Sequence, residues 1–103
     1  MVVFGRATYL ITVGLLFAYP FVLPADTGDK VYGKVCAVCH AAGIAGAPRF
    51  GNKEDWKKHK KPIEELYKHA INGYGVMPPK GGNSSLTDDE VKAAVDYMIK
   101  SSG

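Results

Sequence analysis

Cysteine is scarce in this 103-residue sequence, which contains only Cys36 and Cys39. With no other cysteine in the chain, a closed structural zinc site at this pair would have to recruit a histidine and a distant ligand. The sequence also lacks alternating runs long enough for a strand, and after residue 25 it lacks repeats and low-complexity tracts. These absences predict a single all-α domain.

A large excess of charge of one sign is also missing. The whole chain carries a formal net charge of +3. Residues 26–103 hold twelve Lys and Arg against ten Asp and Glu, because Arg6 lies before this range. A domain with so little net charge gives no electrostatic argument for nucleic-acid binding.

The only long apolar run lies near the N-terminus, at residues 7–23. Arg6 precedes this run and the small residue Ala25 follows it, which is the pattern of a secretory signal peptide cleaved after Ala25. Leu23 occupies a position where a small residue is preferred, and a run of this length is at the lower limit of a membrane span. The alternative is therefore an uncleaved anchor within residues 1–25. Either interpretation places residues 26–103 outside the cytoplasm.

The segment Cys36-Ala-Val-Cys39-His40 has the C-x-x-C-H spacing of a c-type haem attachment site. The two thiols would form thioether bonds to one haem c, and the His40 imidazole would bind the iron from one face. The structural alternatives are a disulfide between the two cysteines or half of a zinc site. Pro48 follows closely, and its carbonyl or a neighbour's could accept a hydrogen bond from the free nitrogen of His40.

Three segments have the apolar spacing of helices. Between the first two, the Gly-rich stretch 41–51 predicts a loop folded against the haem. Thr87 and Glu90 have the spacing of a capping box at the start of the last helix. The segments run from Asp26 or Thr27 into the haem motif, from Pro62 to Gly73, and from Thr87 to Ile99.

The loop of residues 73–82 is the expected source of the second iron ligand, Met77. Its glycines permit close approach to a haem, and the two prolines after Met77 restrict the backbone. Met98 fits the apolar face of the last helix, whereas His59 and His69 lie in polar or amphipathic surroundings. Bis-His ligation and an open distal site remain as alternatives. With His40 and Met77 both bound, the iron has no vacant position, so the expectation is an electron carrier and not an enzyme.

These motifs resemble those of class I cytochromes c, and more narrowly the bacterial cytochrome c5 family. The likeness covers nearly all of residues 27–99. It implies a small fold of three to five helices wrapped around one haem, preceded here by an apolar N-terminal helix. It also implies that Gly28 and Tyr32 cross the last helix near Tyr97, and that Trp56 lines the propionate side of the haem. The matching segments are Gly28-x-x-x-Tyr32, Gly43 to Pro48, Met77 to Gly82, and Leu86 to Met98.

The resemblance further implies a place in a periplasmic respiratory chain, between a quinol-oxidising complex or reductase and a terminal oxidase or reductase. The alternative is a haem subunit of a larger redox complex, held to the membrane by residues 7–23. The densest charge run in the chain is either a docking patch for an acidic redox partner or a solvated surface. Its cations are Lys57, Lys58, Lys60 and Lys61.

Overall fold

The computed structural model describes residues 5, 14 and 25–103. The predicted signal peptide or anchor therefore lies outside the described residues, apart from isolated positions, and its retention stays a prediction. Among the residues described, no helix combines the length and the apolar character needed to cross a membrane. Residues 25–103 form helices, turns and loops without a strand, which confirms the predicted all-α class.

The chain first forms one continuous helical rod made of three segments: α1 (Gly28–Val31), a π-helical turn η1 (Tyr32–Cys36) and α2 (Ala37–His40). Thr27 is the N-cap, one of the two predicted starting residues. In the π-turn the Ala37 N–H donates to the carbonyl of Tyr32, five residues earlier. The remaining elements are the 3₁₀ turn η2 (Ile44–Gly46), α3 (Lys53–Lys58), α4 (Ile63–Asn72), the 3₁₀ turn η3 (Pro79–Gly82) and α5 (Asp88–Ser101).

The predicted C-terminal end of α4 and the predicted N-terminal end of α5 are confirmed, whereas α5 continues to Ser101, two residues beyond the predicted Ile99. Gly73 follows α4 with a φ of 84°, a conformation that glycine adopts without steric cost. The Thr87 hydroxyl accepts from the Glu90 N–H at 3.1 Å, and the Glu90 carboxylate accepts from the Thr87 N–H at 3.0 Å. This reciprocal pair is the predicted capping box, and it fixes where the last helix begins.

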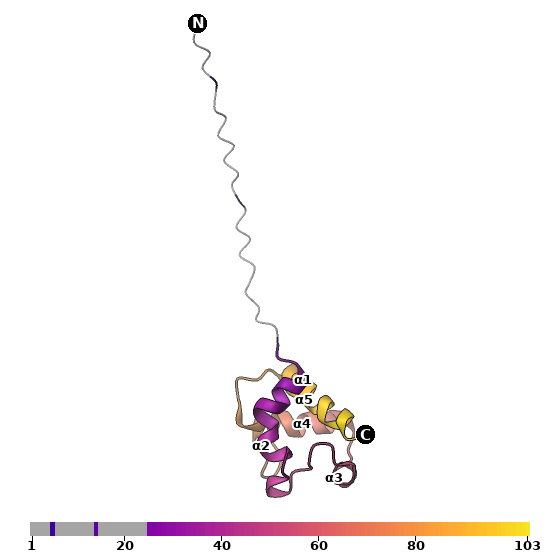
Figure 1. Cartoon of the computed structure of the whole chain (residues 1–103). Coiled ribbons are helices and arrows are strands. Elements are labelled where there is room, and N and C mark those ends of the chain that lie inside the picture. Colours follow the sequence, from indigo (N-terminus) through magenta and orange to yellow (C-terminus); the bar gives the residue numbers. More distant parts are fainter. Residues whose placement is uncertain (1–4, 6–13, 15–24) are drawn as a thin grey trace.

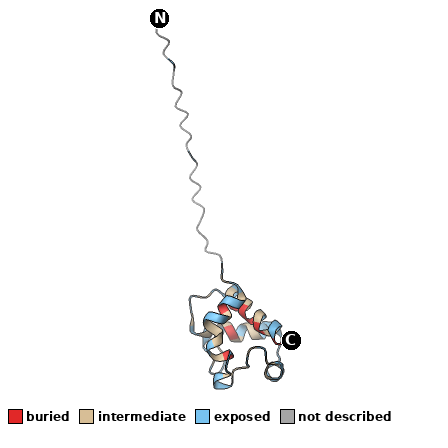
Figure 2. Ribbon diagram, viewed as in Figure 1, coloured by how far each residue is buried: buried red, intermediate tan, exposed pale blue. Residues whose placement is uncertain are grey.

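The helical rod crosses α5, and α4 packs against α5 from another side (Figure 1). The crossing is close, because a Cβ placed on Gly28 would lie 2.2 Å from the Ala93 carbonyl oxygen. Tyr32 and Tyr97 have ring centroids 5.6 Å apart at this crossing, as the resemblance implied. The buried residues lie where these helices meet (Figure 2), and they include Val31, Ala70, Val91, Ala94, Val95 and Met98.

Two short elements differ from expectation. The stretch 41–51 is mostly loop as predicted, but it contains η2, in which Ala45 has a φ of 55°. Helix α3 was not predicted, because six residues are too few to show a helical period. Its one sequence signal is Asn52, whose side chain accepts from the Asp55 N–H at 3.0 Å as an N-cap.

Candidate haem site

The end of the helical rod brings the three residues of the predicted attachment motif together. Cys36, Cys39 and His40 are separated by three and four positions, so they share one side of the helix. His40 is buried, and both cysteines are half-buried and free of any disulfide. Burial raises the pKa of the Cys36 thiol to about 11. Within the part of the chain that the structure describes, no group of three or more His, Cys, Asp or Glu side chains is arranged to hold a metal ion such as zinc.

One nitrogen of His40 is already bonded within the protein. His40 Nδ1 lies 2.8 Å from the Pro48 carbonyl oxygen, so the bond suggested by the sequence is present. Because a carbonyl can only accept, Nδ1 carries the proton, and the lone pair lies on Nε2. The Phe50 N–H also donates to the His40 carbonyl at 2.7 Å, which ties the following loop back to α2. The imidazole is therefore fixed in the tautomer that a metal ligand needs.

Trp56 extends this arrangement from α3. Its indole ring is stacked on the His40 imidazole, with centroids 6.0 Å apart and an angle of 15° between the planes. Its N–H donates to the Arg49 carbonyl at 3.0 Å. Trp56 thus contacts both the histidine and the loop that bonds it, while its predicted place beside the haem propionates stays a prediction.

Met77 lies in a stiff turn between α4 and η3. Tyr74 and Met77 exchange backbone hydrogen bonds of 3.0 and 2.9 Å. After the two prolines, Lys80 has a φ of 54°, and its ammonium donates to the Leu86 carbonyl at 2.7 Å and pairs with Asp88 at 3.1 Å. The segment is thereby anchored to the start of α5.

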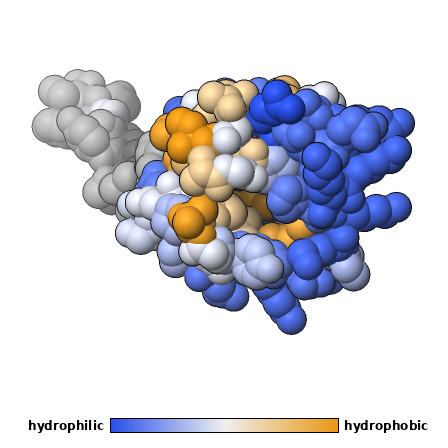
Figure 3. Space-filling view, turned by 90° about the horizontal axis from the view of Figure 1, so that it is seen from below, coloured by the Kyte–Doolittle hydropathy of each residue, from blue (hydrophilic) through white to orange (hydrophobic). Residues whose placement is uncertain are grey.

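A narrow apolar crevice connects the two halves of the predicted site, because Cys36 and Met77 both line it. The Met77 side chain also packs against the core cluster of Ala70, Val91 and Val95. Figure 3 shows apolar side chains gathered around a hollow on the lower face, beside a hydrophilic half of the surface. Two thiols, a neutral imidazole and a thioether beside apolar walls are a donor set that fits haem c.

The other histidines and the other methionine of residues 25–103 make different contacts from His40 and Met77. His59 is exposed, and its Nδ1 lies 2.9 Å from the Asp55 carbonyl. His69 is stacked on Tyr74 with centroids 3.8 Å apart. Met98 is 3% exposed within the core, in agreement with its predicted packing role. Met98 lines the crevice together with Cys36 and Met77, whereas His40, His59 and His69 lie outside its lining.

The lysine run occupies the end of α3 and the loop that follows, and all four of its lysines are exposed. Lys57 lies 3.9 Å from Glu54, and Lys61 lies 3.7 Å from Glu65. Lys58 and Lys60 have no carboxylate partner within 4.0 Å among residues 25–103. The pairs of Lys57 and Lys61 are long and exposed, so all four lysines keep their positive charge at the surface.

Comparison with known proteins identifies the family. Residues 24–98 match the family described as cytochrome c oxidase, cbb3-type, subunit III. Cytochrome c-555 of Chlorobaculum thiosulfatiphilum is 42% identical over 80 residues, covering 73% of this chain and 93% of the relative. Cytochrome c5 of Azotobacter vinelandii is 38% identical over 77 residues, covering 72% and 93%.

A solved structure agrees with these relatives. It is a cytochrome c in an electron-transfer complex with nitrite reductase, and it superposes with a TM-score of 0.69 at 35% identity, covering 78% of this chain and 100% of that one. The sequence matches, the helical fold and the attachment motif lead to the same assignment. The chain belongs to this cytochrome c family and is a small class I c-type cytochrome close to cytochrome c5, an electron carrier with one covalently bound haem c.

Proposed function

We propose that this cytochrome carries single electrons in a bacterial periplasmic respiratory chain, with His40 and Met77 as the axial ligands of its haem iron. The observation that supports this most strongly is the crevice lined by both Cys36 and Met77, which reaches from the attachment motif to the methionine turn. The bond from His40 Nδ1 to Pro48 supports it further, because it leaves Nε2 available to the iron.

Each residue has a defined part in this proposal. Cys36 and Cys39 hold the haem covalently, and the haem supplies the one-electron change between ferric and ferrous iron. His40 and Met77 would both ligate the iron, which would keep oxygen and peroxide away from the metal. A methionine ligand also raises the reduction potential relative to bis-His ligation. The stiff turn around Met77 holds the thioether still, so little reorganisation accompanies electron transfer.

The ligand assignment is tested with carbon monoxide, which binds ferrous haem only where an axial position is open. The reduced wild-type protein is expected not to bind it, and Met77→Ala is expected to bind it readily. Met98→Leu is the matched control, because it removes the other methionine of the domain from the core at nearly constant volume. Ready binding by the wild type, or no gain in Met77→Ala, would show that Met77 is not the ligand.

For partner binding, we propose that Lys58 and Lys60 steer the protein toward an acidic redox enzyme. Val38 and Val76 are 69% and 79% exposed, and they lie in the attachment motif and the methionine turn. Such apolar groups would make the short-lived contact once the lysines have oriented the two proteins. The nitrite reductase in the solved complex is an example of a redox enzyme as partner for a similar cytochrome.

The docking surface is tested by following electron transfer from the reduced protein to membranes of the native host over a range of ionic strength. Lys58→Gln combined with Lys60→Gln is expected to slow the reaction at low salt and to flatten its salt dependence. Lys30→Gln combined with Lys100→Gln changes the net charge equally outside the run. Equal effects of the two pairs would mean that only net charge matters.

The periplasmic location and the fate of the N-terminal segment are tested by the intact mass of the protein in soluble and membrane fractions of the host. A soluble species that begins at Asp26 and carries one haem supports the diffusing carrier. A membrane species that retains residues 1–25 would instead indicate a haem subunit held within a larger redox complex.

A further inference from the structure

Helix α3 buries none of its residues, so it contributes no side chain to the core. Its firm connections run instead to the loop that precedes it. Asn52 caps the helix, and the two residues that follow in the first turns, Asp55 and Trp56, both bond to Arg49. A helix with this contact pattern holds the loop in place and does not stabilise the hydrophobic core.

Arg49 is held at three points. Its backbone N–H and its Nε both donate to one carboxylate oxygen of Asp55, at 3.1 and 2.7 Å. Its Nη2 donates to the other oxygen at 3.3 Å, which makes the ion pair bidentate. Its carbonyl accepts from the Trp56 indole at 3.0 Å. Both backbone polar groups and the guanidinium of this residue are therefore fixed by α3.

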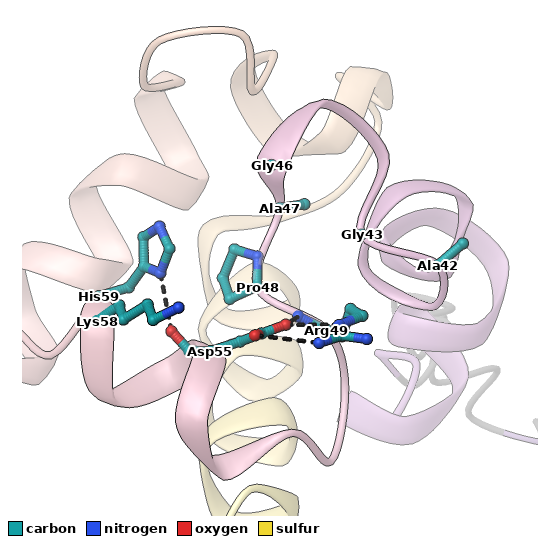
Figure 4. A pocket seen from close by; sticks show the side chains of 9 residues that line it. All are labelled: Ala42, Gly43, Gly46, Ala47, Pro48, Arg49, Asp55, Lys58 and His59. Atoms are coloured by element: carbon teal, nitrogen blue, oxygen red, sulfur yellow. Dashed lines mark hydrogen bonds and ion pairs between the residues drawn. The ribbon is translucent and has the colours of Figure 1, made fainter.

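These polar bonds are what connect the loop to the helix on this side. An open pocket of about 400 Å³ lies between the Gly43–Pro48 part of the loop and α3, and Arg49 and Asp55, bonded to each other, form part of its wall (Figure 4). Where side chains do not fill the space between two segments, packing cannot set their separation. The Arg49–Asp55 pair joins the two segments at the edge of this space.

We propose that Arg49 and Asp55 are positioning residues for the proximal histidine: the pair fixes the peptide after Pro48, and so sets the hydrogen bond from His40 Nδ1 to the Pro48 carbonyl. Pro48 and Arg49 share a peptide unit, so the carbonyl that accepts from His40 belongs to the same plane as the Arg49 N–H that Asp55 binds. Movement of that N–H necessarily moves the carbonyl.

The expected consequence is a change in the reduction potential of the iron, transmitted through its ligand His40. A hydrogen bond at Nδ1 makes a ligating imidazole a stronger electron donor, which favours ferric iron. Loosening the Arg49–Asp55 pair should weaken that bond and raise the reduction potential. This inference rests on the proposed ligation by His40.

The test measures exchange of the His40 Nδ1 proton with solvent by NMR in the reduced holoprotein, together with the reduction potential. Asp55→Asn and Arg49→Gln are each expected to speed exchange by up to about fivefold, the upper end of the range for losing an exposed ion pair. The double variant should be no faster than the faster single variant, because both remove one interaction. Arg49→Lys keeps the charge without the forked geometry and should fall between wild type and Arg49→Gln.

Asp55→Asn removes a negative charge and Arg49→Gln removes a positive one, so comparing them separates the positioning effect on His40 from a direct electrostatic effect on the iron. Removing a negative charge raises the potential by Coulomb interaction, whereas removing a positive one lowers it. Proton exchange should nevertheless increase in both variants. Glu54→Gln is the matched control, with the same charge change on the same helix at a side chain that does not bond the loop, and it should leave exchange unchanged.

Unchanged exchange in Asp55→Asn and Arg49→Gln, or an equal increase in Glu54→Gln, would overturn the proposal. Failure of the ligation itself would give a different result. In that case the His40 ring protons would lack the large contact shifts that direct ligation to ferric iron produces, whatever the exchange rates were.

Discussion

The closest contact between the helical rod and α5 predicts a large effect of a single methyl group at Gly28. In Gly28→Ala the new Cβ would lie 2.2 Å from the carbonyl oxygen and 2.7 Å from the carbonyl carbon of Ala93. Both are backbone atoms in the middle of α5, so they cannot rotate away as a side chain would. The two helices must separate, and the Tyr32–Tyr97 contact beside the crossing opens with them.

The net effect combines two opposing terms. Alanine is favoured over glycine in a helix by up to about 1 kcal/mol. Overpacking of a tight contact costs about 1–3 kcal/mol, and a contact between two backbones lies at the upper end or beyond. We therefore expect Gly28→Ala to lower the free energy of unfolding by about 2 kcal/mol. For a domain of this size, that loss lowers Tm by about 8–16 °C.

Gly33→Ala provides the control within the same rod. A Cβ at Gly33 has no atom within 4 Å, and the residue is exposed. The same substitution should there raise Tm by about 2–8 °C, because only the gain in helix propensity remains. Thermal unfolding of both holoproteins, followed by far-ultraviolet circular dichroism, measures the difference. Equal Tm values for Gly28→Ala and the wild type would refute the tight crossing.

Three further predictions concern caps and charges. Thr87→Ala should lower the free energy of unfolding by about 1 kcal/mol, because the N-terminus of α5 loses its cap; denaturant unfolding measures this. The bond to Asp96 raises the pKa of Tyr67 to about 12, so stability present below pH 10 should fall as the pH rises from about 10 to 12. Tyr67→Phe should remove that fall in thermal unfolding. The Asp55 pKa is lowered to about 2 by its hydrogen bonds from the paired guanidinium. Stability should therefore fall between about pH 4 and 2, and less so in Asp55→Asn.

The features that could be predicted from the sequence are those that depend only on residues close together in the chain. The capping box needs only Thr87 and Glu90, three positions apart, and the end of α4 needs only Gly73 after an apolar period. The attachment motif is likewise contiguous. Each of these signals acts within one or two helical turns, so tertiary contacts do not have to be known.

The features that were not predicted depend on tertiary contacts between segments that are not adjacent in the sequence. The Arg49–Asp55 pair joins residues six apart across a loop whose path is set by η2 and a positive φ at Ala45. The π-turn also has no signal in its residue types. The rod must pack against α5 and also line the crevice, and these contacts with other elements cannot be read from the residues of the rod alone.

That π-turn carries a consequence for the angular phase of the rod. Val31 lies just before the turn and is buried, Cys36 is its last residue, and both line the apolar crevice, whereas His40 lies beyond it and bonds to the loop. One residue in an α-helix corresponds to a rotation of about 100°. Deleting Gly33 or Lys34, which are both exposed, would turn the attachment motif by about this angle relative to Val31. In an unbroken α-helix Cys36, five positions after Val31, would be rotated from it by about 140°. The wider π-turn instead lets both residues line one crevice, and so brings the attachment motif and the contact with α5 onto the same side of the rod.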